Sequence, residues 1–285
     1  MAYGSPETNS EVMEYLAGIY HGRPVPDYAV QENTRKYAMF GGKSPSNGIV
    51  NSIRGKLAGR LRGEASVWLG NKHWKPWLQN VVSEMVTSGI EEITAIPLFP
   101  FASHNIEQSY LSPILEAIDR LERKASINLV NDFSGERRFI DSWAGIVEPI
   151  LGGLDNPLVV FTAHSLPVDS ASEDRYVRSL ERAAGEIAGR VELENFITAF
   201  QSRGKYGRKW LEPSVETAVR QTAGSPGDVL VVPVGFCYEH LEVLYDLDVE
   251  VRESVESMGH HYHRSPLPND DDNFVSMLAE VAGYE

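Results

Sequence analysis

The chain has 285 residues, 42% of them hydrophobic and 23% charged, which is enough for one large or two ordinary globular domains. No apolar run approaches the ~20 residues of a membrane-spanning helix, and the first residues lack the basic start and apolar stretch of a signal peptide. The net charge of −14 argues against general nucleic-acid binding. The single cysteine, Cys237, excludes a disulfide and a cysteine-held iron–sulfur cluster within one chain. We therefore expect a cytoplasmic protein with no integral membrane segment.

Strand and helix patterns alternate along the first half of the chain. Apolar, β-branched runs predict strands at 65–70, 92–99 and 126–130, and helical spacing of apolar residues predicts helices at 74–88 and 106–124. Such alternation is typical of an α/β fold, in which helices cover both faces of a parallel sheet.

The second half repeats the scheme. Strands are predicted at 157–163, 195–200 and 228–234, and their continuous apolar runs indicate strands buried on both faces. Helices are predicted at 173–189, 213–222, 240–257 and 273–282. The helical stretch at 138–151 marks the expected boundary between two halves. We assign residues 1–145 and 262–285 to the first half and residues 146–261 to the second.

Polar side chains follow two of the second-half strands at the point where each strand ends. His164 ends one strand, and His240 and Glu242 follow another. Because ligands of open α/β sheets bind outside the carboxyl ends of the strands, these side chains are predicted to face one crevice. An imidazole there accepts a proton or binds a borderline metal ion. A lone histidine after a strand is more often structural, and the second motif shifts the balance toward function.

An acidic stripe continues from the second motif. Glu242, Asp246 and Glu250 are spaced by four residues, so a helix places their carboxylates on one face. Like charges at this spacing repel, and a divalent cation would make the stripe favourable. An ordinary solvated helix face is the alternative. Asp248 falls off the stripe and is expected to be solvated.

Other motifs are weaker. His260, His261 and His263 are expected to form a surface tract, because adjacent side chains of an extended segment point in opposite directions. His73 and His104 are candidates either for the crevice or for polar loops. The Gly41-Gly42-Lys43 segment lacks the spacing of a phosphate-binding loop, although its glycines permit close approach of a ligand.

Taken together, the motifs resemble those of the ferrochelatase family over essentially the whole chain and in the right order. The central segments are Thr-Ala-His-Ser-Leu-Pro at 162–167, Phe-Gln-Ser-Arg at 200–203 with Trp-Leu-Glu-Pro at 210–213, and the long segment 233–248 that contains His-Leu-Glu. Upstream, Met-Ala-Tyr-Gly-Ser-Pro at 1–6, the segment 40–45, Lys-His at 72–73 and Gln-Ser-Tyr at 108–110 continue the resemblance.

The resemblance implies two Rossmann-like halves facing a central cleft, as in class I chelatases, with the last helix packing back on the first half. It implies a lyase of haem biosynthesis that inserts Fe(II) into a porphyrin, with His164 and Glu242 as catalytic and metal-binding residues. Asp246 and Glu250 would extend the metal site and are a candidate site for an accessory divalent cation. No cofactor is implied beyond the Fe(II) substrate, and a downstream haem-pathway enzyme is a candidate partner.

The opening Met-Ala-Tyr-Gly resembles the coproporphyrin III branch, which places Tyr3 beside the macrocycle. By position, the resemblance assigns the porphyrin carboxylates to five further residues: Tyr20, Lys36, Tyr37, Ser44 and Tyr110. Arginine is the usual residue of the coproporphyrin III branch at positions 20 and 36. Tyr20 therefore lacks the positive charge, and Lys36 keeps the charge but lacks the bidentate guanidinium fork. In the family, apolar residues precede this opening segment; either the natural start lies upstream of Met1, or the first sheet lacks a strand.

Four alternatives stay open at this point. They are a protoporphyrin IX ferrochelatase, a chelatase that inserts cobalt or iron into a reduced tetrapyrrole, a carrier that binds haem or porphyrin without turnover, and a plain α/β scaffold. The long His-Leu-Glu segment favours a ferrochelatase, and a carrier has no need of an acidic stripe.

Overall fold

The computed structural model describes residues 1–168, 172–204, 209–222, 224 and 227–284. The chain forms two compact units, each with a parallel sheet of its own. Unit 1 comprises Met1–Leu98, Asn105–Val130 and Leu278–Glu285, and unit 2 comprises Phe99–His104 and Asn131–Met277. No helix of the described residues is long and apolar enough to cross a membrane.

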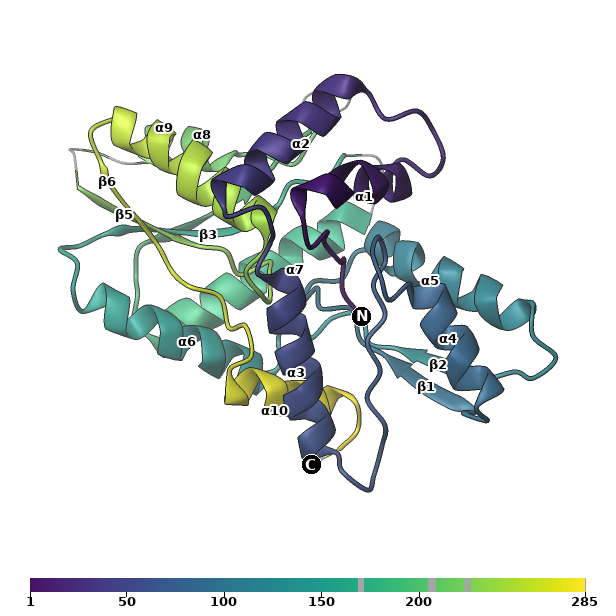
Figure 1. The fold of residues 1–285 in the computed structure, drawn as a ribbon. Coiled ribbons are helices and arrows are strands. Elements are labelled where there is room, and N and C mark those ends of the chain that lie inside the picture. Colours follow the sequence, from purple (N-terminus) through teal and green to yellow (C-terminus); the bar gives the residue numbers. More distant parts are fainter. Residues whose placement is uncertain (169–171, 205–208, 223, 225–226, 285) are drawn as a thin grey trace. The chain divides into compact units, whose positions relative to one another are not determined.

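Unit 2 is built on a four-stranded parallel sheet in the order β4-β3-β5-β6. The strands are β3 (Leu158–His164), β4 (Phe196–Gln201), β5 (Asp228–Val232) and β6 (His261–Arg264). Helices α6 (Arg137–Leu151) and α7 (Ser172–Arg190) lie on one face, and α8 (Val215–Thr222) and α9 (Arg252–Ser257) on the other, as Figure 1 shows. This double winding confirms the predicted α/β class.

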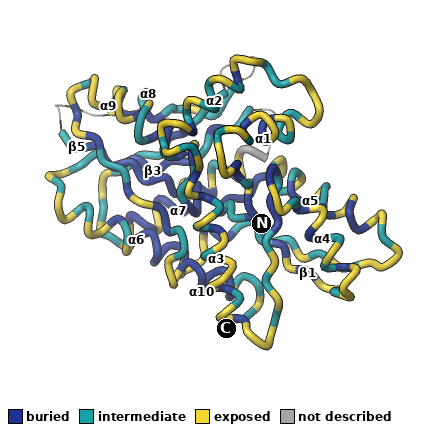
Figure 2. The backbone as a smooth tube through the Cα atoms, viewed as in Figure 1, coloured by how far each residue is buried: buried dark blue, intermediate teal, exposed yellow. Residues whose placement is uncertain are grey.

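The inner strands of unit 2 are buried on both faces. Val159, Val160 and Phe161 on β3 are fully buried, as are the four consecutive apolar residues that end β5, and Figure 2 shows this centre of the sheet in dark blue. Because helices cover both faces, no alternation of polar and apolar side chains is possible along these strands. The interpretation of the second-half apolar runs as buried strands is confirmed.

Unit 1 contains a smaller sheet, in which β1 (Glu92–Ala95) pairs in parallel with β2 (Ser126–Leu129). Its main helices are α4 (Leu78–Thr87) and α5 (His104–Asp119), which with β1 contribute Val82, Ile93 and Ile114 to one buried cluster. The predicted helix at 74–88 begins later, at Leu78. The preceding residues form a turn in which the backbone N–H of Asn71 donates to the carbonyl of Pro76.

The first 60 residues are mostly helical, which the sequence analysis did not anticipate. They form the single-turn η1 (Asn9–Glu11) and the helices α1 (Val12–Ile19), α2 (Asp27–Met39) and α3 (Ser46–Arg60). Helix α2 buries little besides Ala29 and Tyr37, so its apolar periodicity is weak. The buried residues Val50, Ile53 and Leu57 of α3 do follow helical spacing, and they were a usable signal.

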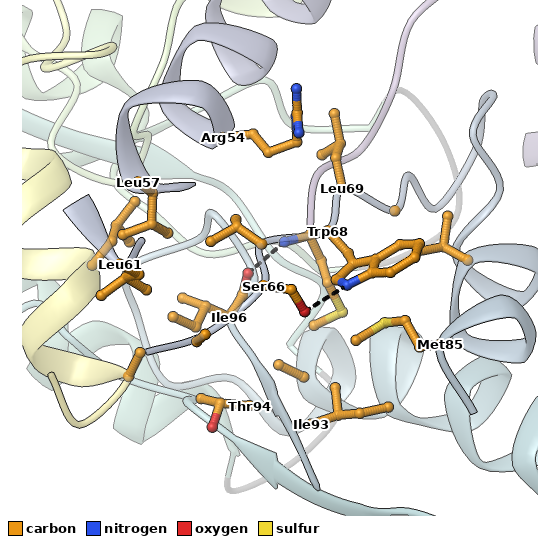
Figure 3. A pocket seen from close by; sticks show the side chains of 18 of the residues that line it. Arg54, Leu57, Leu61, Ser66, Trp68, Leu69, Met85, Ile93, Thr94 and Ile96 are labelled. Carbon is orange, nitrogen blue, oxygen red and sulfur yellow. Dashed lines mark hydrogen bonds between the residues drawn. The ribbon is translucent and has the colours of Figure 1, made fainter. Parts of the chain in front are cut away.

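The predicted strand at 65–70 is wrong. Within the described part of the chain, ladder pairing here is confined to isolated bridges from Asn71 to Ala2 and Trp77. The stretch 65–70 instead lines a cavity of about 440 Å³ in unit 1, between α3, α4 and β1 (Figure 3). An apolar run has the composition of a strand, but it becomes one only when a neighbouring strand accepts its backbone hydrogen bonds.

The C-terminal region holds two further differences. The predicted helix at 240–257 is a π-helix, η2 (Val243–Val251), followed by α9. Residues 261–264, expected in a surface tract, form the edge strand β6, in which Tyr262 is buried. The last helix, α10 (Asp272–Val281), occurs where helical spacing predicted it.

The compact units divide the chain at places other than the expected domain boundaries 145/146 and 261/262. Helix α6 belongs wholly to unit 2 because it packs on α7 of that unit. Strand β6 also belongs to unit 2, since it extends the sheet beyond β5. Of the C-terminal residues expected in the first half, 262–285, those from Leu278 onward belong to unit 1.

Candidate functional site

His164 stands at the carboxyl end of β3, and its backbone is firmly held. The Tyr176 hydroxyl donates to the carbonyl of His164 (2.9 Å), and the Ser165 N–H donates to the carbonyl of Gln201 (2.7 Å). The imidazole Nδ1 lies 2.6 Å from the carbonyl oxygen of Ser165. Because a carbonyl only accepts, Nδ1 carries the hydrogen, and Nε2 is the atom available for other chemistry.

The carboxylate of Glu242 faces that atom. The distance from His164 Nε2 to Glu242 Oε1 is 3.3 Å, and the two side chains are 26% and 46% exposed. Burial alone lowers the pKa of His164, but the charge and hydrogen bond of Glu242, the Ser165 carbonyl and the charge of Asp246 together raise it to about 9. At neutral pH the pair is therefore an imidazolium–carboxylate pair within reach of solvent, and the predicted meeting of the two motifs is confirmed.

The segment that carries the acidic residues is wound as a π-helix. In this winding the backbone hydrogen bonds run from residue i to i+5, and residues four and five apart share a face. Asp246 in η2 is buried, 9% exposed, whereas Glu242 before it and Glu250 near its end are exposed. The three carboxylates thus form a series with different access to water, and π-helical segments are often found at functional sites.

Asp248 differs from the expectation that it is solvated. It is only 22% exposed and pairs with Arg264 of β6, through Nε at 2.7 Å and Nη2 at 2.9 Å. A carboxylate that is mostly removed from water is stabilised by such a partner, because desolvation of a lone charge is costly. The expectation of a solvated Asp248 was wrong, since the strand that supplies Arg264 was not predicted.

His240 has a structural place beside the acidic segment. Its Nδ1 accepts the backbone N–H of Val243 (3.1 Å), and its ring packs edge-on against Phe236 and Tyr238, with centroids 4.8 and 5.7 Å away. Burial lowers the pKa of His240 despite the charge of Glu242. The neutral ring therefore fixes the start of the π-helical segment and leaves His164 and Glu242 as the facing pair.

The described residues contain no cluster of three or more histidine, cysteine or acidic side chains arranged as a ready-made metal cage. His164 and Glu242 supply one nitrogen and one carboxylate, donors that suit first-row divalent ions such as Fe(II). An open pair of ligands leaves positions on a metal ion for water or for an incoming ligand, whereas closed four-ligand sites are structural. The two donors, His164 and Glu242, therefore suit a metal ion that binds briefly and is then released.

In unit 1, the structure brings Tyr3 and Tyr110 around one lysine. The Lys72 Nζ lies 6.0 Å from the Tyr3 ring centroid and 5.4 Å from that of Tyr110. The Tyr3 ring also lies 4.4 Å from the ring of His73. Burial lowers the pKa of Lys72. Two of the predicted porphyrin-binding residues thus share a neighbourhood with a partly buried cation.

The other predicted porphyrin-binding residues lie on or beside α1, α2 and α3. The Tyr37 hydroxyl is 2.9 Å from the Ser5 hydroxyl, and the Ser44 hydroxyl donates to that of Ser46 (3.0 Å). Lys36 lies on α2, with Nζ 4.0 Å from the Glu32 carboxylate, and Tyr20 ends α1.

Sequence reasoning missed three residues that shape these sites: Lys72, Arg264 and Gly235. Lys72 was quoted as part of a motif without a role of its own, although a lysine beside His73 was a visible signal. Gly235 donates its N–H to the carbonyl of Thr162 (3.0 Å), so the loop after β5 lies against the end of β3. Gly235 lay within the motif 233–248 but was given no role of its own, and for Arg264 no local pattern gave a signal.

Comparison with known proteins bears directly on these motifs. The family model described as ferrochelatase matches residues 1–284. A protein named ferrochelatase from Thermoplasma volcanium is 38% identical over 283 residues, which is 99% of this chain and 90% of the relative. A protein named coproporphyrin III ferrochelatase from Listeria monocytogenes is 33% identical over 295 residues, covering 99% of this chain and 95% of the relative.

Solved structures agree on the fold. SirB from Bacillus subtilis with Fe3+ has a TM-score of 0.61 at 14% identity and covers 82% of this chain and 88% of its own. CbiX, described as the terminal enzyme for biosynthesis of siroheme in denitrifying bacteria, has a TM-score of 0.58 at 15% identity, covering 84% and 92%. The expected chelatase-type α/β fold and the expectation of a chelatase of the lyase class are confirmed. On the full-length family match, the histidine–carboxylate pair and the fold, this chain belongs to the ferrochelatase family.

Proposed function

We propose that this chain inserts Fe(II) into coproporphyrin III in haem biosynthesis, with His164 and Glu242 at the point of transfer. The observation that carries the proposal is the 3.3 Å approach of His164 Nε2 to Glu242 Oε1 at neighbouring strand ends of one sheet. A nitrogen and a carboxylate oxygen at that separation both chelate a divalent ion and accept protons.

Metal delivery is assigned to the acidic series. Exposed Glu250 would exchange the first waters of hydrated Fe(II) for carboxylate oxygen, and the more buried Asp246 would take the ion further. Asp246 and Glu250 are also the proposed site of an accessory divalent cation. At His164 the entering ion would displace the Nε2 proton to water, which reaches this partly exposed pair, so that the imidazole nitrogen and the Glu242 carboxylate hold the ion together.

Insertion releases two protons, because a porphyrin with two pyrrole N–H groups becomes a dianionic ligand of Fe(II). His164 and Glu242 are the proposed acceptors, and positioned bases of this kind typically contribute about 10²–10⁴-fold to a rate. As the ion passes into the macrocycle, its two former ligands become free to take the protons. Distortion of the macrocycle by the surrounding protein would expose the pyrrole nitrogens to the ion.

Coproporphyrin III carries four carboxylates, and the proposed contacts are of matching chemistry. Tyr3 would lie beside the macrocycle. The carboxylates would be held by five residues of unit 1: Tyr20, Lys36, Tyr37, Ser44 and Tyr110. Several relatives are named coproporphyrin III ferrochelatases, which supports this choice of porphyrin. A water-soluble tetracarboxylate fits a cytoplasmic location, and a downstream haem-pathway enzyme would receive the product.

The test is anaerobic Fe(II) insertion followed by absorbance, with coproporphyrin III and protoporphyrin IX assayed side by side. We expect turnover with coproporphyrin III and little with protoporphyrin IX. Preference for protoporphyrin IX would overturn the substrate but keep the reaction. Tight porphyrin binding without turnover of either substrate would indicate a carrier and overturn the reaction.

A further inference from the structure

Arg264 is a partly buried cation that pairs with two carboxylates beside the candidate metal site, and the proposed reaction gives it no role. It is only 11% exposed, and its guanidinium contacts two carboxylates. Nε and Nη2 donate to the two oxygens of Asp248 at 2.7 and 2.9 Å, a bidentate pair. Nη1 donates to Glu239 Oε1 at 2.9 Å and to the backbone carbonyl of Ser265 at 2.9 Å.

The two carboxylates flank the segment that carries two of the proposed metal-binding residues, Glu242 and Asp246. Glu239 precedes Glu242, and Asp248 lies within η2 beyond Asp246. Glu239 is itself fixed, because its N–H donates to Asn269 Oδ1 (2.8 Å) and its carboxylate accepts the N–H of Leu267 (3.4 Å). One guanidinium therefore holds both ends of the segment from Glu239 to Asp248.

The backbone of Arg264 belongs to the same sheet that carries His164. Arg264 pairs with Val231 in the register of β6 on β5, and β5 lies beside β3, which ends at His164. The sheet fixes the position of the Arg264 backbone. The bidentate pair with Asp248 then fixes the position of η2 relative to the sheet. The separation of Glu242 from His164 is thus tied to the sheet through Arg264.

We infer that Arg264 is a positioning residue, whose bonds to Asp248 and Glu239 place Glu242 opposite His164 and so set the affinity of that pair for a divalent metal ion. The inference rests on the proposed function, which makes the pair the metal site. A lysine at this position would keep the charge but not the planar fork that binds both oxygens of Asp248.

The experiment compares Arg264→Lys, Arg264→Met and Asp248→Asn with wild type in Co²⁺ titrations of the full chain, followed by the Co²⁺ absorption spectrum. Thermal midpoint, the Kd for coproporphyrin III and the KM for metal are measured on the same samples. Arg182→Met is the matched control. Arg182 also contacts a carboxylate in unit 2, Asp132, but neither residue lies in the segment from Glu239 to Asp248.

We expect Arg264→Lys and Asp248→Asn to weaken Co²⁺ binding and raise the KM for metal by about tenfold or more, with the porphyrin Kd within twofold of wild type. Arg182→Met is expected to lower the thermal midpoint without changing Co²⁺ affinity. If Arg264→Met does not fold, the two milder variants carry the test. If Arg264→Lys and Asp248→Asn both keep the wild-type Co²⁺ affinity and only lower the thermal midpoint, the ion pairs of Arg264 merely stabilise the fold. That result would overturn the inference.

His164→Ala and Glu242→Gln separate this inference from the proposed function. If neither changes Co²⁺ binding, the metal site is misassigned, and both proposals fall. If both lose Co²⁺ binding while Arg264→Lys and Asp248→Asn keep it, the proposed function stands, and only the positioning role of Arg264 is refuted.

Discussion

The backbone of Gly235 lies directly against Ala163, the residue before His164. A Cβ built on Gly235 would lie 2.6 Å from the Cβ and 2.8 Å from the Cα of Ala163, closer than real Cβ atoms approach. The loop that leads from β5 toward Glu242 therefore passes over the end of β3 with no room for a side chain. This contact links the two halves of the candidate site through the main chain.

Gly235→Ala is accordingly expected to displace the end of β3, with a loss of about 1–3 kcal/mol in the free energy of unfolding. A displacement of His164 on the order of 1 Å would lower the insertion rate by about 10²-fold. Urea unfolding and the insertion assay check the two effects. The control is Gly185→Ala in α7, where nothing lies within 4 Å of the added Cβ and stability is expected to rise by up to about 1 kcal/mol. Equal behaviour of the two variants would refute the packing argument.

His164→Ala removes the proposed nitrogen ligand and proton acceptor. We expect the insertion rate to fall by about 10²–10⁴-fold, with the Kd for coproporphyrin III changed by less than a few-fold. Initial-rate kinetics and quenching of porphyrin fluorescence measure the two quantities. His261→Ala, at an exposed histidine of β6 in the same sheet, is the control and should keep the wild-type rate. A His164→Ala enzyme with wild-type turnover would exclude the assignment.

Glu250→Gln tests the delivery role of the acidic series. The change removes one exposed carboxylate near the end of η2, so we expect the KM for metal to rise severalfold while kcat and porphyrin binding stay near wild type. The matched control is Glu253→Gln, which removes the same charge from an exposed position of the next helix, α9. Weakened porphyrin binding in Glu250→Gln, with an unchanged KM for metal, would contradict the delivery role.

His73 gives unit 1 a predictable dependence on pH. Burial, followed by the charges of Lys72 and His21, lowers the pKa of His73 from 6.5 to about 3. Between these values the unfolded chain binds a proton that the folded chain does not, so stability is highest above pH 6.5 and falls as pH falls toward 3. As the pH falls from 6.0 to 4.5, this one group lowers the free energy of unfolding by about 2 kcal/mol.

His73→Gln should remove that part of the slope, which urea unfolding of both proteins at several pH values measures. A direct check is the NMR titration of the His73 ring, whose C–H shifts should stay those of neutral imidazole at pH 4.5. Parallel stability curves for wild type and His73→Gln, or a ring that protonates near pH 6, would show that the site is wetter than its burial implies.

The sequence by itself determined the α/β class, the buried strands of the second half and the meeting of His164 with Glu242. Its power there has a local cause. Continuous β-branched runs such as Val159–Phe161 report burial on both faces, and side chains just after parallel strands converge at one edge of the sheet. The same logic placed α10 and most later helices to within a few residues.

Only the tertiary structure decided the π winding of η2, the pairing of Asp248 with Arg264, the place of Lys72 between Tyr3 and Tyr110, and the fate of residues 65–70. Each depends on a partner far away in the chain. Asp248 was expected to be solvated because the edge strand that carries Arg264 was not predicted. Residues 65–70 have the composition of a strand, but no neighbouring strand in the described part of the chain pairs with them. Local composition fixes what a segment is able to form, and the contacts made on folding select which of those forms it takes.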